Sequence, residues 1–97
     1  MNNEELERAY LFSSNNKPAL EHDTICGCFN CLKIFDPKEL SYVQADNDCD
    51  RLGTAVCPYC SVDSVIGASS GFPITEEFLS EMRKKFFPEY QLLQFFQ

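Results

Sequence analysis

The stretch ICGCFNC, residues 25–31, places three cysteines close together. Its last two, Cys28 and Cys31, form a CxxC pair, and a second such pair, Cys57 and Cys60, follows in CPYC. Two intervening residues let the chain turn tightly enough for both sulfurs to reach one ion at about 2.3 Å. Two such turns brought together complete a tetrahedron of sulfurs. The sequence therefore predicts one structural zinc ion per chain, held by these four cysteines.

Three other side chains are candidates for a ligand role. Cys26 has one residue between itself and Cys28, which gives a tighter chelate, so we expect it to be a small buried apolar residue beside the site. A spare ligand is the alternative for Cys26. His22 lies in the polar stretch EHDT and Cys49 among aspartates, and both are predicted to be loop residues. For the CxxC pairs, the alternatives to zinc are a redox dithiol, free buried cysteines or disulfides.

Length and charge limit the class of protein. The chain has 97 residues, which is room for one small domain. Its start, MNNEELERAY, lacks the apolar core of a signal peptide, and no apolar run approaches the roughly 20 residues that cross a bilayer. These features predict a cytoplasmic protein with no membrane segment, in a compartment where thiols stay reduced. A net charge of −7 disfavours nucleic-acid binding and favours a protein partner.

Two helices are predicted near the ends of the chain. Residues 3–12 form the first, with Asn3 as its N-cap, and residues 13–19 follow as a loop by composition. Residues 74–87 form the clearest helix, because Thr75 can cap it, glutamates occupy its first turn and basic residues its last. The apolar stripe of this helix consists of Phe78, Leu79, Met82 and Phe86.

The middle of the chain predicts short elements around the cysteines. Asp36 as N-cap and Pro37 at the first helical position open a short helix. Residues 54–56 are a brief strand that leads into CPYC, and residues 64–66 are its return strand, which stops at Gly67.

These elements predict a small α+β domain stapled by zinc, with zinc-ribbon-like knuckles and short strands between N- and C-terminal helices. We expect residues 1–97 to form a single domain. Residues 1–20 supply the N-terminal helix and loop, residues 21–67 the zinc-ribbon-like core, and residues 68–97 the C-terminal helix and an apolar tail.

The tail from Pro88 onward, PEYQLLQFFQ, contains unusually many large apolar residues for a chain terminus. Large apolar side chains are costly to leave in water, so we expect a contact with a protein partner or a homodimer. The alternative is that the tail folds back on its own core. The predicted interaction residues are Phe86, Tyr90, Leu93, Phe95 and Phe96.

Two stretches, CGCFNCLKIFDPKEL and TAVCPYCSVDSVIGASSGFPITEEFLSEM, resemble a family of small bacterial cytoplasmic proteins. The family pattern is CGCFYC, then F-x-P-x-E, then TAxCPYCGIDSVIG and a Gly-aromatic-Pro-Ile-Thr helix start, and it covers about residues 24–87. The resemblance implies a zinc-ribbon-like fold with the four paired cysteines as ligands, and it implies no particular activity. Ser61 stands where the family has Gly, at a position that often needs a left-handed backbone.

The sequence predicts a non-enzymatic zinc-binding module for protein–protein interaction. Four cysteines close the coordination shell of a zinc ion, and a single His leaves no Ser/His/Asp set. Small size and acidity suit an inhibitor or regulator of a larger complex, of the kind that phages and mobile elements carry. The alternative is a nucleic-acid-binding zinc-ribbon regulator. The only cluster of basic residues in the sequence that could serve this role is Arg83, Lys84 and Lys85.

Overall fold

The computed structural model describes residues 1–43 and 53–88. Its first helix, α1 (Asn3–Tyr10), begins at a capping box. The Asn2 side chain accepts a hydrogen bond from the Glu5 N–H at 2.8 Å, and the Glu5 carboxylate accepts one from the Asn2 N–H at 3.3 Å. The N-cap is therefore Asn2, and the prediction of Asn3 is wrong by one position. A capping box needs an acidic side chain three residues after the N-cap, and Glu5 lies at that distance from Asn2.

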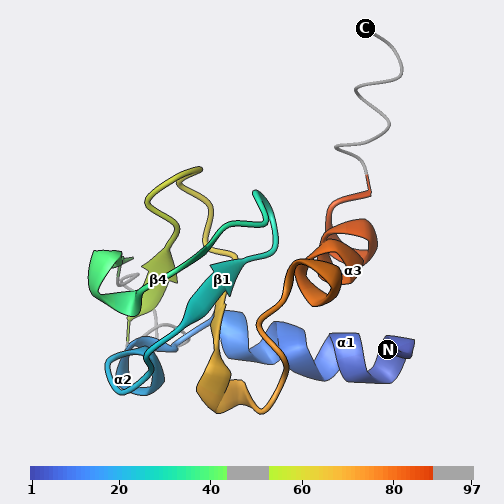
Figure 1. The fold of residues 1–97 in the computed structure, drawn as a ribbon, viewed down its shortest axis with the longest axis horizontal. Coiled ribbons are helices and arrows are strands. Elements are labelled where there is room, and N and C mark those ends of the chain that lie inside the picture. Colours follow the sequence, from blue (N-terminus) through green and yellow to red (C-terminus); the bar gives the residue numbers. More distant parts are fainter. Residues whose placement is uncertain (44–52, 89–97) are drawn as a thin grey trace, which may run out of the picture.

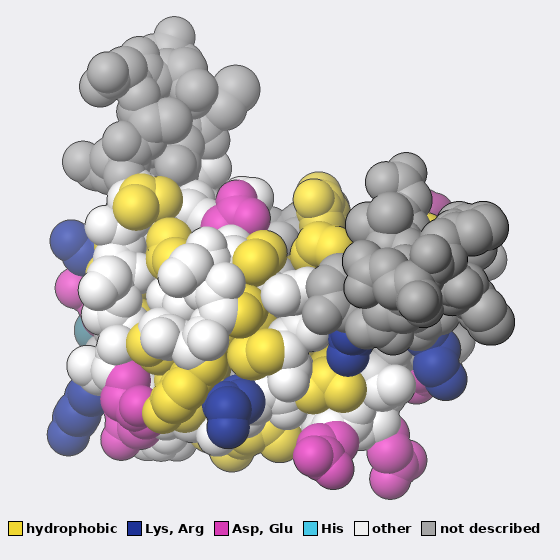
Figure 2. Space-filling model, turned by 90° about the horizontal axis from the view of Figure 1, so that it is seen from above, with side chains coloured by type: hydrophobic (Ala, Val, Ile, Leu, Met, Phe, Trp, Pro, Cys, Tyr) yellow, Lys and Arg dark blue, Asp and Glu magenta, His cyan; other side chains and the backbone are white. Residues whose placement is uncertain are grey.

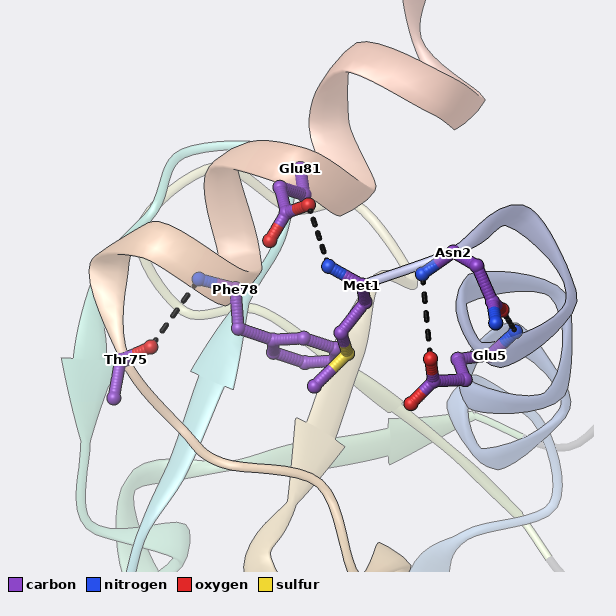
Figure 3. A network of polar contacts seen from close by, with 6 residues as sticks. All are labelled: Met1, Asn2, Glu5, Thr75, Phe78 and Glu81. Atoms are coloured by element: carbon purple, nitrogen blue, oxygen red, sulfur yellow. Dashed lines mark hydrogen bonds and ion pairs between the residues drawn. The ribbon is translucent and has the colours of Figure 1, made fainter.

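The second long helix, α3 (Glu76–Phe86), begins where the sequence predicts. Thr75 is its N-cap, and the hydroxyl oxygen of Thr75 accepts from the Phe78 N–H at 3.2 Å. Figure 3 shows this cap beside the start of α1, where the Met1 amino group forms an ion pair with Glu81 at 3.1 Å. The two helices are thus held together at their exposed edge as well as through their apolar faces.

The predicted loop over residues 13–19 is wrong in part. The chain leaves α1 through a 3₁₀ turn, η1 (Leu11–Ser13), and then forms one helical turn, α2 (Lys17–Leu20). Pro18 lies near the start of that turn, where its fixed φ fits a helix and its missing N–H costs nothing. The helix predicted after Asp36 is a single 3₁₀ turn, η2 (Pro37–Glu39), and Asp36 does cap it.

Within residues 1–43 and 53–88, five short strands form two antiparallel sheets. The first has the order β2-β1-β5, and the second pairs β3 with β4. In Figure 1, α1 and α3 lie on one side of β1, and β4, which belongs to the second sheet, lies on the other side. The strands are β1 (Cys26–Cys28), β2 (Ile34–Phe35), β3 (Ser41–Val43), β4 (Thr54–Val56) and β5 (Val65–Gly67).

The predicted pairing of residues 54–56 with residues 64–66 is wrong, and the side chain of Asn16 explains why. Its oxygen accepts from the Ala55 N–H at 2.9 Å, and its amide nitrogen donates to the Val65 carbonyl at 2.9 Å. Asn16 thereby occupies backbone groups of β4 and β5 and bridges the two sheets. With Asn16 in this position, β5 pairs with β1 and β4 pairs with β3.

We expect Asn16→Ala to lower the free energy of unfolding by about 2 kcal/mol, since it removes the side-chain partner of the Ala55 N–H and of the Val65 and Phe12 carbonyls. Urea denaturation of the metal-loaded protein measures the loss. Asn16→Asp is the matched variant, because it keeps the acceptor for Ala55 and loses the donors to the Val65 and Phe12 carbonyls. An Asn16→Ala protein as stable as the parent would mean that the bridge contributes nothing.

Two apolar clusters form the core, one on each side of β1 and β5. Side chains alternate along a strand, so Ile66 faces the helices and Val65 faces the second sheet. Gly27 leaves room for α3, because a Cβ there would lie 2.8 Å from the Leu79 side chain. The helical cluster contains Leu6, Ala9, Phe29, Ile66, Phe78, Leu79 and Met82. The second cluster contains Leu20, Cys26, Cys28, Phe35, Ala55, Cys57 and Val65.

The predicted stripe of α3 faces the helical cluster. Three of its members are fully buried, and Phe86 is half-buried with its ring stacked on Tyr10 at 4.4 Å between centroids. The other predicted interaction residues, Tyr90, Leu93, Phe95 and Phe96, lie outside the described residues, as does Cys49. In the described ranges, no helix combines the length and apolarity needed to cross a membrane.

Candidate metal centre

The first cysteine pair lies in a tight turn at the end of β1. The Leu32 N–H donates to the Cys28 carbonyl at 2.8 Å, and the Cys28 N–H donates to the Lys33 carbonyl at 3.0 Å. Leu32 has a left-handed backbone, with φ 67°. These bonds fold the chain back on itself, so Cys28 and Cys31 point toward the same place.

The second pair repeats this turn after β4. The Ser61 N–H donates to the Cys57 carbonyl at 2.9 Å, and the Cys57 N–H donates to the Val62 carbonyl at 3.0 Å. Ser61 is also left-handed, with φ 65°, which confirms the backbone predicted at this position. The two cysteine turns therefore share one backbone conformation. The sequence predicted the left-handed residue only for the second turn, at Ser61.

The two turns bring their sulfurs together. The four Sγ atoms lie within 4.8 Å of one another. Two sulfur–sulfur contacts join the different turns: Cys28 to Cys60 at 3.6 Å and Cys31 to Cys57 at 3.6 Å. Among the described cysteines all are free of disulfides. The predicted ligands thus form a cluster that is close enough to hold a metal ion.

Backbone and hydroxyl donors surround the sulfurs. The Asn30 N–H donates to Cys28 Sγ at 3.3 Å, and the Tyr59 N–H donates to Cys57 Sγ at 3.4 Å. The Ser64 hydroxyl lies 3.0 Å from Cys28 Sγ. Such donors stabilise thiolates and orient metal ligands. Ser64 is a supporting residue that sequence reasoning missed, because nothing in DSVIG marks its contact with a cysteine far away in the chain.

Burial sets the acidity of the thiols. It raises the pKa of Cys28, against hydrogen bonds from Ser64 and backbone N–H groups that lower it, and it likewise raises the pKa of Cys57. Burial also acts on Cys60, but hydrogen bonds from Asn30, from the backbone and from neighbouring thiols outweigh it and lower the pKa of Cys60. Metals bind thiolates, so binding must release protons here, and metal affinity falls as pH falls.

The third cysteine of the opening stretch lies outside the cluster. Cys26 is fully buried in β1, and its sulfur donates to the Phe35 carbonyl at 3.5 Å. Burial first, and then the nearby charges of Asp23 and Asp36, raise the pKa of Cys26 to about 12. Cys26 is therefore a protonated core residue next to the site, as predicted. His22 is exposed, which agrees with the predicted loop position.

The chain was compared with protein-family models, curated proteins and solved structures. No family model, no curated protein and no solved structure matches it. The candidate metal centre therefore rests on the geometry of the four cysteines alone.

We expect Ser61→Gly to stabilise the protein by about 0.5–1 kcal/mol, because glycine adopts the left-handed backbone without the steric cost that serine carries. The midpoint of urea denaturation measures the gain. Ser14→Gly is the matched control, since Ser14 is exposed and extended, with φ −124°. It should be neutral or slightly destabilising. A stabilisation of equal size at both positions would contradict the explanation from backbone geometry.

Proposed function

We propose that the cluster holds one zinc ion in a structural role, in a zinc-ribbon-like pair of knuckles. A tetrahedral ion with Zn–S bonds of about 2.3 Å separates its sulfurs by about 3.8 Å. The two cross-turn distances, both 3.6 Å, support this fit. Sulfur-only tetrahedral sets suit zinc. Bound zinc would supply a cross-link between the two turns and, with all four positions filled by cysteine, no open position for a substrate.

The closed four-cysteine shell is the observation that carries the functional proposal. We infer a non-enzymatic module that acts by binding another protein, as a small acidic inhibitor or regulator of a larger complex of the phage or mobile-element type. The acidic composition and the reduced thiols support a cytoplasmic location. The resemblance to small bacterial cytoplasmic proteins implies the same four zinc ligands and adds nothing about the activity.

Exposed apolar side chains support an interaction role. Figure 2 looks onto the face that carries the two cysteine turns at the top of Figure 1, and hydrophobic side chains gather across it between the grey segments. The Tyr59 side chain, on the second cysteine turn, is half exposed, and Ile34, in β2 after the first turn, is also exposed. Large apolar side chains that gather on an exposed face are typical of protein contacts.

A single capture experiment tests the proposal against the nucleic-acid alternative. The zinc-loaded protein is immobilised and exposed to a lysate of the organism that encodes it, with and without nuclease. We expect a protein retained in stoichiometric amount in both cases. Capture that disappears after nuclease, together with direct binding to duplex DNA at about 0.15 M salt, would replace the proposal with nucleic-acid binding. Metal analysis of the same preparation should give one zinc per chain.

A further inference from the structure

A second surface, away from the cysteine turns, exposes two large apolar side chains in a fixed turn. Leu11 is 72% exposed and Phe12 is 44% exposed, and both belong to η1. The Phe12 ring packs edge-on against Phe72, with 6.4 Å between centroids. The contact with Phe72 holds the Phe12 ring in place, and an exposed leucine beside an exposed phenylalanine is typical of a contact surface.

A small pocket lies next to these side chains, between η1, α2 and the 3₁₀ turn η4 (Ala68–Ser70). Its volume is about 100 Å³. Leu11, Phe12, Ala19 and Leu20 form its apolar part. Among the described residues that line it, Asp23 alone is charged, and the polar ones are Ser14, Asn15, Asn16, Ser69 and Ser70. The pocket thus combines an apolar wall with a single negative charge.

The Asp23 carboxylate is positioned but not neutralised. It accepts from the Ser69 N–H at 3.0 Å and from the Ser69 hydroxyl at 2.9 Å. Gly67 leaves room for it, because a Cβ at Gly67 would lie 2.2 Å from Asp23 Oδ2. Among the described residues no lysine or arginine forms an ion pair with Asp23. A carboxylate has about four acceptor sites, so two remain for a ligand.

We propose that this pocket receives an arginine side chain from an apolar, basic segment of a protein partner. The alkyl stem of arginine would lie along the leucine and phenylalanine side chains, and its guanidinium would donate to Asp23. Arginine suits the site better than lysine because its guanidinium is more weakly hydrated and donates in a fixed fork. This inference rests on the proposed function, since it names the partner chemistry of a protein-binding module.

Charge complementarity favours a basic partner over a second copy of the chain. The protein carries a net charge of −7, so a second copy would bring a like charge to the same surface. A basic segment is attracted by the net negative charge of the whole protein as it approaches, and by the Asp23 carboxylate once it is bound. The apolar side chains of η1 would be covered by apolar neighbours of the arginine.

The probe is the peptide acetyl-Ala-Leu-Arg-Leu-Ala-amide, titrated into the zinc-loaded protein and followed by ¹⁵N NMR. We expect saturable shifts at Leu11, Asp23 and Ser69. The same peptide with citrulline in place of arginine keeps the shape and loses the charge, and it should bind about tenfold more weakly. Asp23→Asn should also weaken binding of the arginine peptide about tenfold. Leu11→Ser, an exposed change that leaves the core intact, should weaken it about threefold.

Asp63→Asn is the matched control, because it removes the same charge from an exposed position outside the pocket. It should leave binding unchanged. Equal loss in both aspartate variants, equal binding of the citrulline peptide, or shifts that map elsewhere would overturn the proposal. If the Asp23→Asn protein still captures its partner as the parent does, the arginine pocket is wrong while the interaction function stands.

Discussion

Replacing Cys57 by serine should remove the metal and the cooperative unfolding transition together. Cys57 is buried at the centre of the cluster, 3.6 Å from Cys31, and it begins the second cysteine turn. Structural zinc sites contribute about 10–16 kcal/mol of apparent binding free energy at pH 7. That exceeds the net stability of most domains, about 5–15 kcal/mol. We therefore expect Cys57→Ser to be largely unfolded, as the parent should be after treatment with a strong chelator.

Elemental analysis and thermal denaturation together test this expectation. Cys26→Ala is the matched control, because Cys26 is another buried cysteine, located in β1, that lies outside the cluster. It should keep one zinc per chain and lose about 1 kcal/mol of stability. A Cys57→Ser protein that folds cooperatively and retains a full equivalent of zinc would refute the assignment. Loss of zinc in Cys26→Ala would make that residue a ligand.

The local parts of this fold are readable from the sequence, because they depend on residues close together in the chain. The CxxC spacing marks both cysteine turns, and the Thr75 cap and apolar stripe mark α3. The left-handed backbone at Ser61 follows from the same local turn. Errors of one or two residues, such as Asn3 for Asn2, arise where neighbouring residues can serve the same role.

The contacts that assemble these parts were not readable, because they join distant residues by single side chains. Asn16 looks like an ordinary loop residue, yet its side chain bridges β4 and β5, which do not pair with each other. Ser64 and Asp23 are likewise recognised only once the fold places them beside Cys28 and Ser69. Side chains of these types form hydrogen bonds in many settings, so neither composition nor periodicity indicates which partners they will have.

Phe29→Ala should cost about 3–5 kcal/mol of stability without removing the metal. Phe29 lies inside the first cysteine turn, between Cys28 and Asn30, yet its side chain is only 1% exposed and belongs to the helical cluster. Its ring lies 6.2 Å from the Phe86 ring and 5.7 Å from the Phe87 ring, centroid to centroid. The Phe29 ring thereby packs the first cysteine turn against α3, and removal of the ring would leave a large cavity between the turn and the helix.

Pro58→Ala is the matched control, because Pro58 occupies the same place in the second cysteine turn and its side chain is exposed. Its expected cost is at most about 1 kcal/mol, from the greater freedom of the unfolded chain. Urea denaturation of the zinc-loaded variants measures both values, and elemental analysis should give one zinc for each, since neither change touches a sulfur. Equal, small losses in the two variants would show that the helices and the metal centre are stabilised independently. A large loss confined to Phe29→Ala would show that the helices depend on this ring to hold them to the metal centre.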